Sequence, residues 1–343
     1  MRLLLPALAL LAACSSSSEP ALTKATSLQC PSPGALPFRL SSSGFQTSAN
    51  KALVADNPRD KDEASDTIGN PGGLTASVYL ADDQSPSMTP VDYHGAKART
   101  MLTNGYLSTP LAGENVSLWF YDTVRASWQS VGSGKTGSDG YYDLPATGFV
   151  APNGQPIYSM LEADGSCAEH FDYLFAPGSK VIVTDIDGTL TTDDSQIAMQ
   201  IPDETYVPKM MTAADHLMQA WAAKGYPIVY LTARPHVLRN ESRGWFTDLG
   251  FPDGPLITKN GGLMDDAYKT IWMNRMVNNF QWTVVAAYGN AITDITAYAN
   301  AGVPKDRTFI VGPVGGTSGT VAIPNMDYTD HIATFVAAQP ANQ

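Results

Sequence analysis

Two carboxylates one residue apart, directly after an apolar run, are the residues of this chain best suited to chemistry. Asp185 and Asp187 follow residues 181–184, whose apolar sequence predicts a buried parallel strand. The two side chains point the same way, at the edge where open α/β sheets bind ligands. Like charges held this close favour a bound cation, and Mg²⁺ prefers oxygen ligands. The pattern predicts a metal-assisted site with Asp185 as nucleophile and Asp187 as acid and base.

Four stretches in order resemble the motifs of the haloacid dehalogenase superfamily of phosphohydrolases. They are Asp185-Ile186-Asp187-Gly188-Thr189, Tyr230-Leu231-Thr232-Ala233-Arg234, Lys269, and Tyr288-Gly289-Asn290 with Thr293-Asp294. In finer detail they are similar to the catalytic domain of the lipins, Mg²⁺-dependent phosphatidate phosphatases. They also resemble the lipin-type domain at the C-terminus of membrane-associated phosphatidylinositol transfer proteins. The resemblance extends from Ala176 to the end of the chain.

The resemblance implies a set of metal ligands and a covalent mechanism. Asp185 is expected to form an aspartyl-phosphate, while Asp187 protonates the leaving alcohol and then activates water. Mg²⁺ is expected on the Asp185 carboxylate, the Asp187 carbonyl and Asp294, with Asn290 as a further ligand, direct or through water.

Other residues are expected to contact the transferring phosphoryl group. Thr232, at a strand end, can donate its hydroxyl, and Lys269 can neutralise charge. Gly188 and Thr189 belong to the loop whose amides would surround the phosphoryl oxygens. Arg234 either contacts the substrate or forms a structural ion pair.

Two of these assignments have plain alternatives. Asp294 could serve merely as the cap of the helix that begins beside it, without binding a metal. Lys269 could be a solvated helix residue, since lysine is seldom buried, and Lys259 lies nearby as another candidate for the motif lysine.

Strands and helices alternate from Ala176 onward, as in a doubly wound, Rossmann-like α/β fold with a parallel sheet. The predicted strands are 181–184, 228–231, 256–258, 283–288 and, as the last, 308–311; the predicted helices are 209–224, 237–249, 269–280 and 293–301. The intervals between the motifs leave no room for a large cap domain. An open site of this kind favours a large substrate or one presented in a bilayer.

The preceding part of the chain divides into three segments. Residues 1–13 are predicted to be a signal peptide, and residues 14–70 a lipidated cysteine and a mostly flexible tether. Residues 71–175 predict a small all-β, immunoglobulin-like sandwich domain, with strands at 76–80, 116–121 and 158–163 separated by turns. Residues 176–343 form the predicted phosphatase domain.

The N-terminus resembles that of a bacterial lipoprotein. A basic start and a short apolar run lead to Leu11-Ala12-Ala13-Cys14, so Cys14 is expected to carry a lipid, although an ordinary secretory signal is the alternative. This predicts a protein anchored in the bacterial cell envelope outside the cytoplasm. Ser15, in place of Asp, favours the periplasmic side of the outer membrane. The other two cysteines, Cys30 and Cys167, either pair or stay as thiols.

Charge and motif content narrow the possible functions. A formal net charge of −12 argues against a nucleic-acid partner. The first hypothesis is a phosphatidate phosphatase held at a phospholipid membrane by its lipid anchor. The second is a phosphatase of soluble or protein phosphomonoesters. The third is a non-catalytic phosphatidate-binding module, like the transfer-protein domains, which lack the nucleophile that this chain keeps in Asp185.

Overall fold

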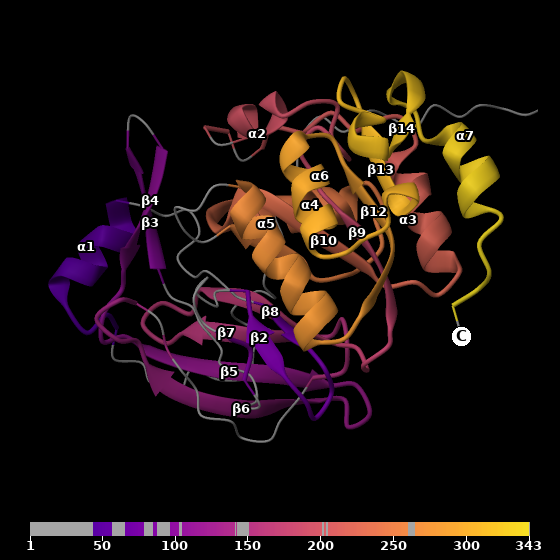
Figure 1. Ribbon diagram of the computed structural model, residues 1–343. Helices are drawn as coiled ribbons and strands as arrows, with labels where there is room; N and C mark the ends of the chain where they lie inside the picture. The colour runs from indigo at the N-terminus through magenta and orange to yellow at the C-terminus, as the bar shows by residue number, and fades with distance from the viewer. Residues whose placement is uncertain are drawn as a thin grey trace, which may run out of the picture.

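The computed structural model contains an all-β unit followed by an α/β unit (Figure 1). It describes residues 44–56, 66–78, 85–87, 97–102, 105–140, 142, 151–200, 202–203, 205–259 and 265–342. The predicted signal peptide, Cys14 and Cys30 lie outside these residues. No helix in the described part of the chain has the length and apolar character needed to cross a membrane.

A six-stranded parallel sheet forms the centre of the α/β unit. Its strands are β9 Lys180–Thr184, β10 Ile228–Pro235, β11 Leu256–Lys259, β12 Thr283–Gly289, β13 Thr308–Val311 and β14 Val321–Ile323. They lie in the order β11-β10-β9-β12-β13-β14, and each neighbouring pair is parallel. Counted from β9, this is the order 3-2-1-4-5-6 of a doubly wound fold, with the reversal between β9 and β12. The predicted fold class is confirmed.

Helices cover both faces of this sheet. They are α2 Ser195–Gln200, α3 Ala214–Ala223, α4 Arg239–Asp248, α5 Asp265–Asn274, α6 Ile292–Asn300 and α7 Thr329–His331, with π-helical turns at Arg275–Asn279 and Ile332–Val336 and 3-10 turns at His236–Leu238, Lys305–Arg307, Thr317–Gly319 and Pro324–Met326. In β9, Ile182 belongs to the core that α3 and α4 share, whereas Val181 and Val183 belong to the core of α5 and α6. This two-sided burial explains the unbroken apolar run before Asp185.

The structure differs from the prediction at several element boundaries. Strand β14 follows β13, so residues 308–311 are not the last strand. The helix predicted from residue 209 begins only at Ala214, because Met210 and Thr212 form bridges with Thr191 and Asp327 instead. Helix α2 was not predicted. It is short, so the described residues between the first two motifs still contain no large cap domain.

The all-β unit contains one six-stranded sheet and a separate hairpin. Its elements are α1 Ser48–Asp56, β1 Thr67–Gly69, β2 Thr75–Ser77, β3 Lys97–Leu102, β4 Gly105–Pro110, β5 Asn115–Asp122, β6 Ser127–Lys135, β7 Pro156–Leu161 and β8 Cys167–Leu174. The sheet order is β2-β1-β8-β7-β5-β6, and within the part of the chain that is described β3 pairs with β4 alone. A second facing sheet, which the predicted sandwich requires, is not among the described residues. Helix α1 covers part of one face instead, where Val54 packs with Val116, Leu118 and Phe120.

The predicted start of this unit at residue 71 is also corrected. Helix α1 and strand β1 both lie within residues 14–70, and β1 pairs with β8 in the sheet. The segment was predicted as a tether because its Ser- and Pro-rich composition hides these short elements. Cys167 is disulfide-bonded, which excludes the free-thiol alternative for it; its partner cysteine lies outside the described residues.

A buried ion cluster joins the two units. Asp66, just before β1, accepts hydrogen bonds from Arg239 (2.5 Å) and Arg243 (2.6 Å), which lie one turn apart on α4. Burial alone would raise the pKa of Asp66, but the two guanidinium groups outweigh it and hold the pKa below its usual value. Both guanidinium groups lie over the Phe171 ring of β8, and that of Arg243 also lies over Tyr173. The β unit is therefore fixed to helix α4.

Candidate active site

Three predicted site residues meet at the carboxyl end of the parallel sheet. Asp185 follows β9, Asp294 lies in the first turn of α6 after β12, and Lys269 comes from α5. The Lys269 Nζ lies 3.0 Å from Asp185 Oδ1 and 2.6 Å from Asp294 Oδ1. All three side chains are buried. Lys269 thus has the position expected of the motif lysine, while Lys259 ends β11.

The charges of this trio depend on one another. Burial raises the pKa of Asp185 to about 8; Lys269 opposes this, while Asp294 and Asp187 add to it. Burial by itself would lower the pKa of Lys269, but the two carboxylates raise it above its ordinary value. Lys269 therefore remains a cation. Additional positive charge beside Asp185 would favour the carboxylate form that a nucleophile requires.

Asp187 is held by a bidentate ion pair. Arg234 Nε and Nη2 each donate to an Asp187 carboxylate oxygen at 2.8 Å. Arg234 is fully buried, and its Nη1 also donates to Gln200 of α2 (2.9 Å) and Ser242 of α4 (3.0 Å). Of the two predicted roles of Arg234, the structure therefore supports the ion pair and not substrate contact. The side chain of Asp187 remains 14% exposed.

The loop after β9 depends on Gly188. Its φ is +68°, and a Cβ there would lie 2.0 Å from Asn290 Nδ2 and 2.6 Å from Asp194 Oδ1. The Gly188 N–H donates to Thr191 Oγ1 (3.0 Å), and the Thr189 hydroxyl donates to Asn290 Oδ1 (3.4 Å). Gly188 and Thr189, predicted to contact substrate, are thus hydrogen-bonded within the protein. These hydrogen bonds within the protein fix the conformation of the loop without a ligand.

Asp294 caps helix α6, and its predicted role as a metal ligand stays a prediction. Its Oδ2 accepts the N–H groups of Asn290 (3.0 Å) and Ala291 (3.1 Å) at the start of α6, and its Oδ1 faces Lys269. Gly289 must be glycine, because a Cβ would lie 2.5 Å from the Asp294 Cβ.

Thr232 is fully buried in β10, and its hydroxyl oxygen accepts the Arg234 N–H at 3.1 Å.

Sequence reasoning missed three supporting residues. Asp194, which lies in the loop after the first motif, accepts a hydrogen bond from Asn290 Nδ2 at 3.0 Å. Burial raises its pKa, and the carboxylates of the site add to the shift. Gln200 and Ser242, which hold Arg234, carry no motif signal. Only the tertiary packing of α2 and α4 brings them to Arg234 of β10.

The donor set fits a hard divalent cation. Asp185, Asp294 and Asn290 offer oxygen atoms, the ligands that Mg²⁺ prefers. In the described part of the chain, no three Asp, Glu, His or Cys side chains converge as a complete ligand group. A cation here would therefore also need carbonyl oxygens and water, and the predicted Mg²⁺ site stays a prediction. The raised pKa of Asp185 is the observation that favours added positive charge.

The α/β unit is similar to a domain of lipid-transfer proteins. Residues 182–312 match the family model described as PITM 1-3, LNS2 domain. Protein retinal degeneration B of Drosophila melanogaster is 28% identical over 233 residues, covering 66% of this chain and 18% of that protein. Human membrane-associated phosphatidylinositol transfer protein 1 is 27% identical over 207 residues, covering 59% and 16%. The chain thus spans less than a fifth of the length of these relatives.

Solved structures give only a distant similarity. A putative HAD-like phosphatase from Mesorhizobium loti is 16% identical, with a TM-score of 0.35, covering 48% of this chain and 87% of that chain. Class C acid phosphatase from Bacillus anthracis is 14% identical, with a TM-score of 0.28, covering 35% and 54%. Similarities at this level carry no inference about activity, and the strand order itself defines the fold.

Proposed function

We propose that the chain is a Mg²⁺-dependent phosphomonoester hydrolase that acts through an aspartyl-phosphate, with phosphatidate at a membrane surface as its substrate. The observation that carries the proposal is the buried trio of Asp185, Lys269 and Asp294, with Asp187 fixed beside it by Arg234. A structural ion pair with Lys269 would need Asp185 alone after strand β9. It would not require Asp187 two residues further on.

In the first step, a carboxylate oxygen of Asp185 attacks phosphorus and the bond from phosphorus to the leaving oxygen breaks. Asp187 must be protonated for this step and so releases one of its two hydrogen bonds from Arg234; it gives its proton to that oxygen, which leaves as an alcohol. In the second step, Asp187 takes a proton from water as the water oxygen attacks phosphorus. The bond to Asp185 then breaks, which releases phosphate and restores both side chains. Lys269 offsets negative charge during both steps.

Asp185, Asp294, the Asp187 carbonyl and Asn290 are the groups that would hold Mg²⁺. When bound, the cation supplies positive charge for the carboxylates and the phosphoryl oxygens. Arg234 keeps Asp187 oriented through its two hydrogen bonds. The described loop and helix residues keep the trio from bulk water, since all three side chains are buried.

Three observations support a lipid substrate. The α/β unit matches a domain of phosphatidylinositol transfer proteins. No large cap domain lies between the motifs in the described residues. The sequence around Cys14 predicts a lipid anchor, which would hold the enzyme in the bacterial cell envelope, at the periplasmic side of the outer membrane.

The test is phosphate release by the purified chain with Mg²⁺, on phosphatidate in mixed micelles and on a panel of soluble phosphomonoesters. We expect release mainly from phosphatidate, abolished by chelation and by Asp185→Asn. Asp306 is an exposed carboxylate outside the site. Asp306→Asn is therefore the matched control and should retain full activity. Wild-type activity in Asp185→Asn would refute the assigned nucleophile.

The remaining outcomes separate the alternatives. Release mainly from soluble esters would keep the mechanism and replace the substrate. Absence of release from every ester, with phosphatidate vesicles still bound, would place the chain with the non-catalytic binding modules.

A further inference from the structure

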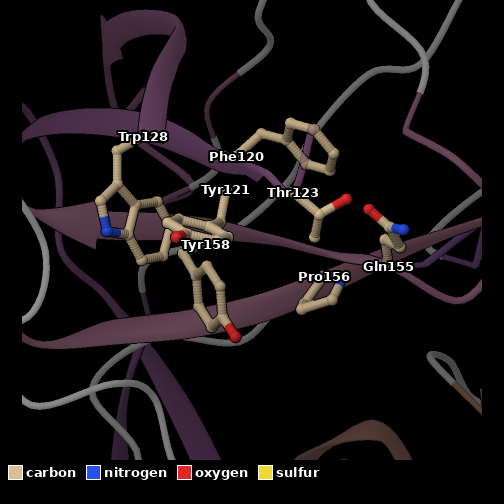
Figure 2. A pocket seen from close by; sticks show the side chains of 7 residues that line it. All are labelled: Phe120, Tyr121, Thr123, Trp128, Gln155, Pro156 and Tyr158. Carbon is tan, nitrogen blue, oxygen red and sulfur yellow. The ribbon is translucent and has the colours of Figure 1, made fainter. Parts of the chain in front are cut away.

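A second candidate binding site lies on the β unit, outside the phosphatase site. A cavity of about 520 Å³ opens at the adjoining ends of β5 and β7, a size typical of ligand pockets. Figure 2 shows the seven residues that line it: Phe120, Tyr121, Thr123, Trp128, Gln155, Pro156 and Tyr158. None of them belongs to the candidate active site, and none contributes to the ion cluster between the units.

Three aromatic rings form a fixed wall of this cavity. Tyr121 and Trp128 are directly opposed in the β5–β6 ladder, and their ring centroids lie 5.3 Å apart at 68°. Tyr158 of β7 lies 5.5 Å from Trp128, again at 68°. The edge-to-face contacts on both sides hold the indole in place. The Tyr158 hydroxyl is also hydrogen-bonded to Glu169 of β8, which fixes the third ring.

The polar groups of the cavity are neutral and available. No charged side chain is among the seven described residues that line it. Within the described residues, the Trp128 indole N–H, the Thr123 hydroxyl and the Gln155 side-chain amide have no hydrogen-bond partner. In Figure 2 the Thr123 hydroxyl and the Gln155 amide lie close together at one end, away from the Trp128 ring. The cavity therefore combines aromatic faces with separate donors and acceptors.

We propose that this cavity binds the neutral sugar rings of a glycan. A pyranose ring presents C–H groups on its faces, which pack on aromatic rings, and hydroxyl groups around its edge, which need both donors and acceptors. A hydrocarbon chain would cover the three polar groups without pairing them, which is unfavourable. An ionic ligand would find no opposite charge in the lining.

The proposal is independent of the phosphatase activity. The β unit is fixed to helix α4 through Asp66, so a glycan bound to it would hold the whole molecule in place. The site is thus suited to attaching the protein to a glycan rather than to converting one, because no acidic side chain is among the described residues that line the cavity.

The test is binding of the full chain to a printed array of neutral glycans, followed by titration calorimetry with the best array ligand. We expect binding, weakened about tenfold or more by Trp128→Ala, which removes the central ring. Val124→Ala is the control, because this side chain is 94% exposed beside the cavity but does not line it. It should bind like the wild type.

A second variant protects the test against misfolding. The double variant Thr123→Val and Gln155→Ala removes polar groups from the rim and leaves the aromatic wall intact, and it should also weaken binding. The proposal is overturned if no array glycan binds, or if both variants bind as the wild type does. It is equally overturned if Trp128→Ala lowers binding to phosphatidylcholine vesicles, or self-association in sedimentation, while glycan binding is unchanged.

Discussion

At the scale of single residues, the phosphatase site depends on a glycine that does no chemistry itself. We predict that Gly188→Ala lowers phosphate release strongly, because the new Cβ would displace Asn290 and Asp194 and because a φ of +68° strains any L side chain. The comparison is kcat for the variant and the wild type at saturating substrate.

Gly178→Ala separates the two causes. Gly178 also has a positive φ, of +85°, but a Cβ there meets nothing within 4 Å. This variant should be destabilised by about 1 kcal/mol through backbone strain and keep its turnover. Equal losses of turnover in the two variants would show that strain, rather than displacement of Asn290, is responsible.

A second prediction at this scale concerns a buried carboxyl in the β unit. Burial raises the pKa of Asp172 to about 7; the Ala151 N–H bonded to Oδ2 opposes the shift, and Oδ1 has no partner among the described residues. Because the folded-state pKa lies above the unfolded value, Asp172 lowers stability as pH rises from about 4 to about 7, and the penalty is constant above that. Asp172→Asn should remove it.

The expected gain in the free energy of unfolding is at most about 4 kcal/mol at pH 8 and near zero at pH 4. Urea unfolding of the wild type and Asp172→Asn across this pH range measures the difference. A gain that does not depend on pH would contradict the assigned titration.

At the scale of elements, helix α4 connects the β unit to the general acid. Its two arginines, Arg239 and Arg243, bind Asp66, and Ser242 between them accepts a hydrogen bond from Arg234, which in turn holds Asp187. The side chains in these contacts are buried, except for that of Asp187, which is partly exposed. A change at the junction of the units should therefore reach the active site through one rigid helix.

We predict that Asp66→Asn lowers the free energy of unfolding by about 3–5 kcal/mol, because two buried arginines lose their carboxylate. Turnover per folded molecule should also fall as α4 shifts. Asp253→Asn is the matched control: Asp253 lies 4.0 Å from Arg243 but is 67% exposed, so its loss should change stability by less than about 1 kcal/mol. Similar effects of the two substitutions would rule out a special role for the buried cluster.

The elements predicted from sequence are those with strong local signals. Strand β13 was predicted with its observed bounds, and β9 to within one residue, because fully buried parallel strands are short apolar runs. The positions of Asp185 and Asp294 follow from strand ends and the topology of the sheet. Lys269 could not be placed with the same certainty, since only tertiary packing of α5 brings its amino group to both carboxylates.

Other features depended on contacts that leave no local trace. β1 and β14 have three residues each, too few for a periodic pattern. β1 pairs with β2 and β8, and β14 pairs with β13. The pairing of Arg234 with Asp187 joins two motifs 47 residues apart. Sequence spacing alone could not decide between that pairing and a substrate contact.

At the scale of the whole molecule, net charge decides how the protein approaches its proposed substrate. The formal charge of −12 repels a vesicle that contains anionic phosphatidate. The Debye length is about 30 Å at 0.01 M salt and about 8 Å at 0.15 M, so added salt screens this repulsion. The proposed lipid anchor at Cys14 would bypass the repulsion by holding the enzyme at the surface.

We therefore predict that the chain without lipid releases phosphate from phosphatidate vesicles faster as ionic strength rises between these values, at constant free Mg²⁺. A protein recruited by a basic patch would show the opposite trend, because salt weakens its attraction to the surface. A soluble phosphomonoester serves as the control, since its turnover involves no approach to a charged surface and should change little. If turnover on vesicles instead falls with salt, a local basic surface must dominate over the net charge, and recruitment would not require the anchor.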